Sequence, residues 1–189
     1  MSDFGKPCTY DYSKFRDGDI GFSHGCDLLG WLIRLGQSGF GGAGNLAEPN
    51  HAFFFYEING EWFAAEVGPS GITLNSLEEY TKKDNQVVAV MRWSAFDDAA
   101  LREKWKTEIT KWIWQKQNSG YDFNGAIKSA LPWWPWGNDP NKEFCSEDVG
   151  SWLIHFGCNL FPAQDPLELY DTLTRRTRDL SAILGYKNI

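Results

Sequence analysis

Two aromatic-rich apolar runs flank Asn59 and Gly60 in the segment HAFFFYEINGEWFAAEVG, residues 51–68. An Asn-Gly pair between two such runs is a strong sequence signal for a β-hairpin with a two-residue turn. A further apolar run, QVVAVMRW at residues 86–93, is typical of a buried strand. The pattern therefore predicts an antiparallel sheet that is built around a hairpin.

Helical spacing of apolar residues appears in other parts of the chain. Residues 95–120 predict a long helix, and Gly120 is suited to end it. Residues 145–157 predict a second helix, with a short helix expected over 27–36 and one or two in a C-terminal extension, 158–189. The expected core residues of the long helix are Ala100, Leu101, Trp105, Ile109, Trp112 and Ile113, and those of the second helix are Val149, Trp152, Leu153 and Phe156.

The length and charge of the chain narrow the class of protein. Its 189 residues suit one domain spanning residues 1–189, and the mixed pattern predicts an α+β fold in which a small antiparallel sheet packs against helices. The formal net charge of −7, without a basic cluster, argues against a nucleic-acid partner.

Hydropathy along the chain bears on its location. No stretch approaches the roughly 20 apolar residues that span a bilayer, and the first residues lack the apolar core of a secretory signal. We therefore expect no transmembrane segment and a chain that starts in the cytoplasm. It would leave the cell only by lysis or on a phage particle.

The four cysteines, at positions 8, 26, 145 and 158, show no CxxC spacing and are expected to be free thiols. The three histidines are scattered, so we expect neither a structural metal nor another cofactor. His24 and Cys26, in SHGC, give only a weak metal-binding signal.

Cys145 stands at the expected start of the second helix. One interpretation is structural, because free cysteine is often buried and packs as a small apolar residue. The other interpretation is that Cys145 is a nucleophile. The unpaired amides and the dipole at a helix N-terminus favour a thiolate, and the same amides can stabilise an oxyanion.

A nucleophilic cysteine needs a base, and the three histidines differ in their suitability. His155 lies about 15 Å from Cys145 along the same helix, at 1.5 Å per residue. His24 is expected in a loop with no acidic partner. His51 opens the first strand of the predicted hairpin, where its neighbours can be worked out.

The register of the hairpin brings a carboxylate close to His51. With a two-residue turn, Ile58 faces Glu61, and stepping back along both strands brings Phe53 opposite Glu66. His51 then lies on the same face of the sheet and is a diagonal neighbour of Glu66, about 7 to 8 Å away between Cα atoms. A carboxylate that orients an imidazole is the third member that a Cys–His pair requires.

Five segments, RDGDIGF, NHAFFFYE, AAEVGPSGI, GYDFNGA and EFCSEDVGSWL, occur in this order within residues 16–157. In these segments the chain resembles the permuted NlpC/P60 papain-like proteins, and in particular the YiiX/YaeF-like amidases. The resemblance implies a circularly permuted papain-like fold with Cys145 as nucleophile, His51 as base and Glu66 as the polar third residue. It also implies that Tyr121 and Asp122 line the site, although a loop turn explains these two residues equally well.

These features predict a cysteine hydrolase or acyltransferase, such as an amidase or peptidase. It would cleave an amide or ester bond in a peptide, a peptidoglycan-like molecule or a lipid. Trp133, Trp134 and Trp136 in PWWPW are candidates for stacking on sugars or for contact with a lipid interface, the alternative being that they cover the core. A different class of function is a non-catalytic module of the same fold that binds a partner through its aromatic surface.

Overall fold

A computed structural model gives the fold of the chain. The residues that it describes are 8–25, 49–68, 71–82, 85–116, 120, 122, 124–125, 144–160, 166–174, 178–179 and 187–188. The short helix expected over 27–36 lies outside them.

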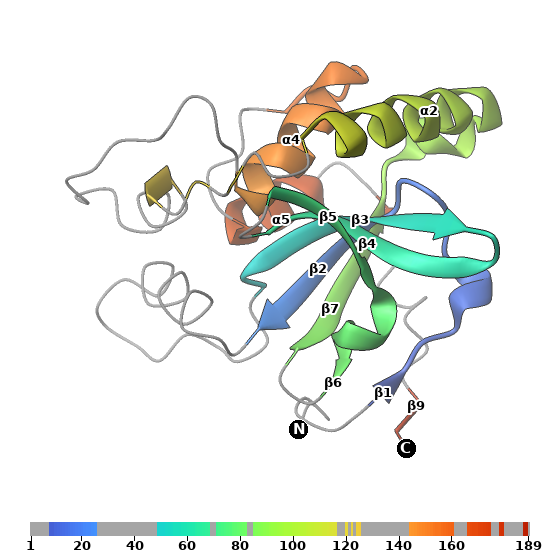
Figure 1. Cartoon of the computed structure of the whole chain (residues 1–189), viewed down its shortest axis with the longest axis vertical. Coiled ribbons are helices and arrows are strands. Elements are labelled where there is room, and N and C mark those ends of the chain that lie inside the picture. Colours follow the sequence, from blue (N-terminus) through green and yellow to red (C-terminus); the bar gives the residue numbers. More distant parts are fainter. Residues whose placement is uncertain are drawn as a thin grey trace.

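The predicted α+β class and its antiparallel sheet are confirmed within the described residues. The sheet has the order β5-β4-β3-β2-β7-β6, and every neighbouring pair is antiparallel (Figure 1). The strands in this order are β2 (Ile20–Gly25), β3 (His51–Ile58), β4 (Glu61–Gly68), β5 (Gly71–Ser76), β6 (Thr81–Lys82) and β7 (Asn85–Arg92), and β8 (Arg178–Asp179) also pairs with β7. β3, β4 and β7 match the predicted strands, whereas β2 and β5 were not predicted.

The hairpin of β3 and β4 has the predicted turn and register. Asn59 and Gly60 have φ angles of 54° and 86°, the left-handed backbone that a two-residue hairpin turn requires. Ile58 pairs with Glu61, and the same register continues along the strands to the pair of Phe54 and Ala65.

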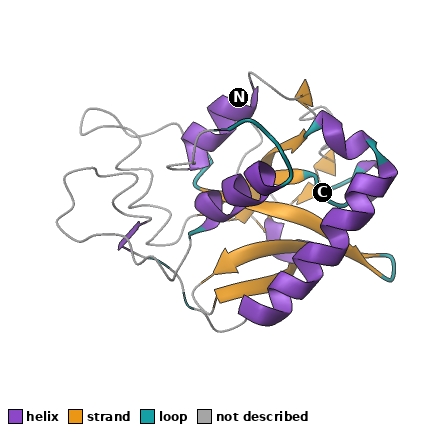
Figure 2. Ribbon diagram, turned by 90° about the horizontal axis from the view of Figure 1, so that it is seen from above, coloured by secondary structure: helices purple, strands orange, loops and turns teal. Residues whose placement is uncertain are grey.

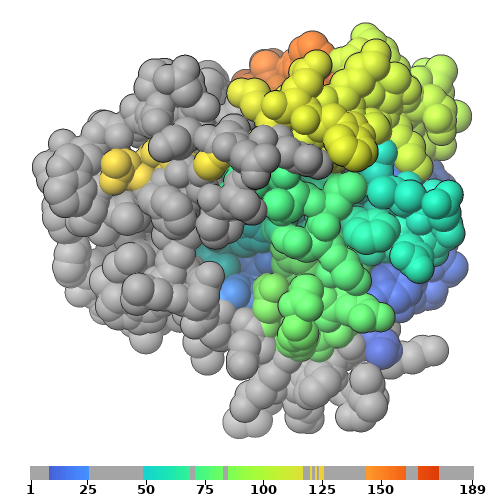
Figure 3. All heavy atoms as spheres, viewed as in Figure 1, coloured from blue at the N-terminus to red at the C-terminus, as the bar shows by residue number. Residues whose placement is uncertain are grey.

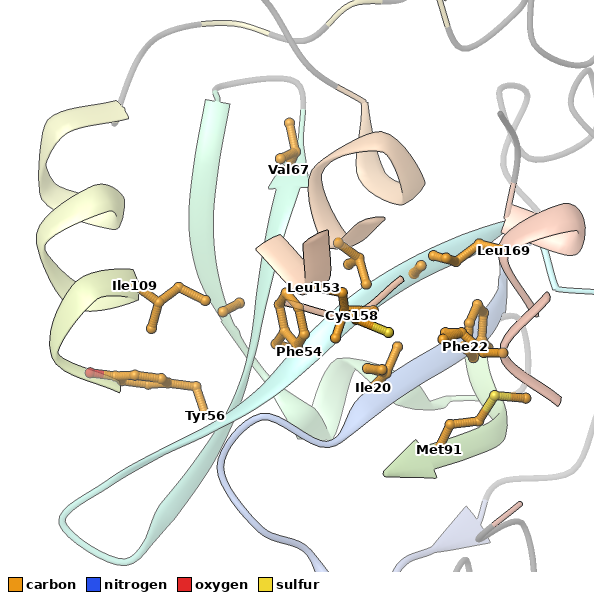
Figure 4. Packing of buried hydrophobic residues seen from close by; sticks show 14 of the residues in the cluster. Ile20, Phe22, Phe54, Tyr56, Val67, Met91, Ile109, Leu153, Cys158 and Leu169 are labelled. Carbon is orange, nitrogen blue, oxygen red and sulfur yellow. The ribbon is translucent and has the colours of Figure 1, made fainter. Parts of the chain in front are cut away.

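The helices cover one face of the sheet (Figures 1 and 2). α2 (Ala99–Lys116) and α4 (Cys145–His155) match the two predicted helices, and α5 (Pro166–Thr174) follows them in the chain. No helix in the described part of the chain is long and apolar enough to cross a membrane. Figure 4 shows several of the side chains that form this first core, among them Ile20, Phe22, Phe54, Tyr56, Met91, Ile109, Leu153 and Leu169.

A second core lies on the opposite face of the sheet, beneath the 3-10 helices η1 (Tyr12–Lys14) and η3 (Leu77–Tyr80). It contains Tyr10, Phe15, Phe53, Phe55, Ala64, Leu77, Tyr80, Val87 and Val90. Alternate residues of β3 therefore enter different cores. Because both faces are covered, the apolar run AFFFY is buried without a break, as is usual for a strand with two packed faces.

The C-terminal segment contains short strands in addition to the predicted helix. Residues 158–189 were predicted to be helical, and α5 with its buried Leu169 and Leu173 agrees. However, β8 (Arg178–Asp179) and β9 (Lys187–Asn188) are two-residue strands, which pair with β7 and with β1 (Cys8–Thr9). Such short strands depend on distant partners, so no local sequence pattern identifies them.

Gly21 in β2 makes room for an aromatic ring of the second core. A Cβ atom at Gly21 would lie 2.3 to 2.8 Å from three ring atoms of Phe53, which is fully buried. We therefore expect Gly21→Ala to lower the free energy of unfolding by about 1–3 kcal/mol through overpacking, measured by urea denaturation. In the control, Gly68→Ala, the new Cβ meets only ordinary contacts at 3.7 and 3.9 Å and should cause no such loss. Equal losses in the two variants would contradict this prediction.

Candidate functional site

Cys145 is the first residue of α4, and the backbone of the preceding Phe144 is extended. The cysteine is buried but belongs to neither hydrophobic core. α4 packs against β3 and β4, with Val149 and Leu153 buried in the first core. The thiol therefore lies beside the first amides of a helix that is firmly packed on the hairpin, where a thiolate is favoured.

His51 connects this thiol to the carboxylate of Glu66. Its Nε2 atom contacts Oε2 of Glu66, and its ring lies close enough to the Cys145 side chain for the thiolate charge to raise the pKa of the imidazole. Since Nε2 faces the carboxylate, Nδ1 is the ring nitrogen that remains for the thiol. The structure thus brings together the three residues that the sequence singled out, at the end of the hairpin opposite its turn.

Glu66 is buried, and both of its carboxylate oxygens accept further hydrogen bonds. The Tyr80 hydroxyl donates to Oε2 at 2.5 Å, and the Asn75 side-chain amide donates to Oε1. The ring of Tyr80 is stacked on that of His51, with a centroid distance of 6.4 Å and an interplanar angle of 4°. Three donors therefore surround a carboxylate whose burial would otherwise be costly.

The sequence analysis did not identify Tyr80 or Asn75. Asn75 lies on β5, where Glu66 pairs with Thr73, so Asn75 is a diagonal neighbour of Glu66 on that side. Recognising β5 as a strand would have found it by the same register argument that found His51. Tyr80 ends η3, and no local sequence pattern brings it to this site.

The charges at the site shift the pKa values of His51 and Glu66 in opposite directions. Burial alone lowers the pKa of His51, but the negative charges of Glu66 and of the Cys145 thiolate outweigh it and raise the pKa well above 6.5. Burial alone raises the pKa of Glu66, but the charge of His51 and hydrogen bonds from His51, Tyr80 and Asn75 leave it lowered. Both shifts favour an imidazolium that lies between two anions.

Of the other predicted site residues, the structure describes Asp122. Asp122 is buried, and its carboxylate accepts a hydrogen bond from the backbone N–H of Gly125 at 2.8 Å. A Cβ atom at Gly125 would lie 3.3 Å from the ring of Phe144, so Gly125 lies next to the start of α4. Tyr121, Trp133, Trp134 and Trp136 lie outside the described residues.

The two remaining histidines are His24 and His155. His24 was expected in a loop, but it is a fully buried residue of strand β2, and Cys26 lies outside the described residues. His155 is exposed at the end of α4, where its Nε2 lies 2.9 Å from Oε2 of Glu108.

The described residues contain no group of three or more His, Cys, Asp or Glu side chains that could hold a metal ion.

The described residues form a cavity of about 620 Å³, which lies at the turn end of the hairpin and is lined by residues such as Tyr12, Glu61 and Trp62. Cys145, His51 and Glu66 do not line it. β5 and η3 contribute to the lining of this cavity, and Figure 3 shows them in green at the surface, beside the hairpin in teal.

The chain was compared with known proteins. No family model matches it, and no curated protein matches it. Among solved structures it is similar to the crystal structure of YiiX, a metalloprotein of Escherichia coli O157:H7 designated DUF1105. The match has 11% sequence identity and a TM-score of 0.57, and it covers 87% of this chain and 96% of the YiiX chain. At this identity the likeness concerns the fold alone, so the chain has an α+β fold similar to that of YiiX.

The pair of His51 and Glu66 predicts a pH-dependent contribution to stability. The raised pKa of His51 stabilises the fold below pH 6.5, and this contribution is lost as pH rises through the raised value. The lowered pKa of Glu66 stabilises the fold above pH 4.5, and this contribution is lost as pH falls through the lowered value. We expect Glu66→Gln to lower the free energy of unfolding by about 2–4 kcal/mol between these limits, and by less at higher pH.

Urea denaturation at a series of pH values measures this difference. Glu108→Gln, which removes the carboxylate beside the exposed His155, is the matched control and should change stability by less than about 1 kcal/mol. A loss in Glu66→Gln that does not vary with pH would rule out the ion pair as its cause.

Proposed function

We propose that the chain is a cysteine hydrolase or acyltransferase with a circularly permuted papain-like fold, acting on an amide or ester bond. The observation that carries the proposal is the contact of Cys145, at the start of a helix, with a histidine that is held by a buried carboxylate. His51 precedes Cys145 in the chain, the reverse of the papain order, as circular permutation would produce. The fold similarity to YiiX agrees with the branch of proteins that the sequence motifs resemble.

In the proposed reaction, His51 takes the thiol proton of Cys145, and the thiolate attacks the substrate carbonyl carbon. The amide N–H groups at the start of α4 stabilise the negative charge on the carbonyl oxygen. The tetrahedral intermediate collapses to a thioester, and the leaving group takes the proton from His51. Water or another acceptor, deprotonated by His51, then attacks the thioester and releases the acyl group and the thiolate, which is again paired with protonated His51.

Glu66 has a supporting part in these steps. It holds the His51 ring with Nε2 turned away from the thiol, and its charge stabilises the imidazolium that forms during each proton transfer. Thiolate attack on a carbonyl is common to peptide, peptidoglycan and lipid substrates, so the proposal covers all three classes.

The first prediction of this proposal concerns the reactivity of the thiol. We expect iodoacetamide to alkylate Cys145 selectively below about pH 7, because the His51 imidazolium stabilises the thiolate. His51→Ala should remove this selectivity, whereas His155→Ala, the loss of an exposed histidine, should preserve it. Rates are measured for each cysteine by mass spectrometry across pH.

Cys158 provides an internal reference, since it is also a buried free cysteine but packs in the first core. Alkylation of the unfolded protein shows the reactivity of each thiol without the fold. If folded Cys145 reacts no faster than Cys158 at any pH, Cys145 is not an activated nucleophile and the proposal is wrong.

The second prediction concerns turnover of a simple ester, p-nitrophenyl acetate. Cys145→Ala and His51→Ala should each reduce hydrolysis by a factor of about 10³ or more, because the two residues act as a unit. Glu66→Gln should cost less than either of these changes, because Glu66 acts only through His51. Release of p-nitrophenolate is followed by absorbance, and undiminished hydrolysis by Cys145→Ala would contradict the proposal.

A further inference from the structure

The hydroxyl of Tyr80 donates a hydrogen bond to the same oxygen of Glu66 that contacts His51. Tyr80 is buried, and none of the proposed reaction steps uses it. The Asn75 amide donates to the other oxygen of the same carboxylate. Each oxygen of Glu66 thus accepts a hydrogen bond from a neutral donor, and Oε2 also contacts the imidazole.

Several contacts fix the direction of the Tyr80 hydroxyl. The backbone carbonyl of Tyr80 accepts a hydrogen bond from the Tyr10 hydroxyl at 2.5 Å, and that hydroxyl in turn accepts one from the backbone N–H of Val87 at 3.0 Å. The Tyr80 ring also packs on Phe53, with ring centroids 4.7 Å apart. The end of η3 is therefore tied to β7 and to the second core, and its hydroxyl points into the site.

We infer that Tyr80 and Asn75 are positioning residues, which hold the Glu66 carboxylate ionised and in the one orientation that supports His51. This inference rests on the proposed function. A hydrogen bond that is donated to the charged form of a carboxylate favours that form. Donors on both oxygens also prevent the carboxylate from rotating away from the imidazole.

Loss of the Tyr80 hydroxyl should change the pH dependence of Cys145 reactivity in a definite direction. In the described part of the chain, the titratable groups around Tyr80 include Glu66, His51, Cys145, Tyr10 and Glu79, which precedes it on η3. Without the Tyr80 hydroxyl, Glu66 stabilises the His51 imidazolium less well. The imidazolium then loses its proton at a lower pH, so the range of pH over which the thiolate–imidazolium pair exists should narrow on its alkaline side.

The test is site-resolved alkylation of Cys145 by iodoacetamide across pH in Tyr80→Phe, which keeps the ring and removes only the hydroxyl. We expect the alkaline midpoint of the Cys145 rate, at which His51 loses its proton, to move downward by about half to one pH unit. Tyr56→Phe is the matched control, because it loses a buried hydroxyl that pairs with Thr110 Oγ1 at 2.5 Å on the other face of the sheet. It should leave the midpoint unchanged.

Asn75→Ala provides a second variant on an exposed strand position and should shift the midpoint in the same direction, so the inference stays testable if Tyr80→Phe does not fold. A wild-type midpoint that neither Tyr80→Phe nor Asn75→Ala moves would overturn the inference and leave the proposed function intact. An equal shift in Tyr56→Phe would also overturn it, because general loss of stability would then explain the effect. If wild-type Cys145 shows no His51-dependent reactivity, the proposed function itself fails, and the two failures are thereby distinguished.

Discussion

The two-residue turn at Asn59 and Gly60 sets the register on which both cores and the site depend. Its left-handed backbone matches the right-handed twist of the adjoining strands, so the hairpin closes without a bulge. Because side chains alternate along a strand, this register decides which aromatic residues of β3 face the helices and which face η3. A slip of one residue would exchange the two sets and turn Glu66 away from the face of His51.

Burial of the Glu66 charge explains why so many polar groups converge at one end of the hairpin. An isolated buried carboxylate is costly, and here His51, Tyr80 and Asn75 offset that cost by donating to both oxygens. The rings of Phe53 and Tyr80 pack beside His51, and Glu66 is buried, which strengthens its interaction with the imidazole. The same packing that builds the second core therefore also sets the electrostatic environment of the imidazole.

The helix that carries Cys145 belongs mainly to the opposite core. Val149 and Leu153 fasten α4 to the face covered by helices, whereas His51 lies on the face of Phe53 and Tyr80. The thiol meets the imidazole only because α4 begins where β3 begins. The position of the site thus depends on how the helix is placed along the sheet.

The sequence by itself determined the hairpin, its register, the two long helices and the shared face of His51 and Glu66, because turn chemistry and side-chain periodicity are local properties. It did not reveal β2, β5, β8 or β9, since a short strand is defined by hydrogen bonds to partners elsewhere in the chain. It also did not identify Tyr80, which reaches Glu66 through a 3-10 helix held by Tyr10. Only the tertiary structure brought Cys145 to His51, because packing between distant segments, and no local pattern, decides where a helix begins relative to a strand.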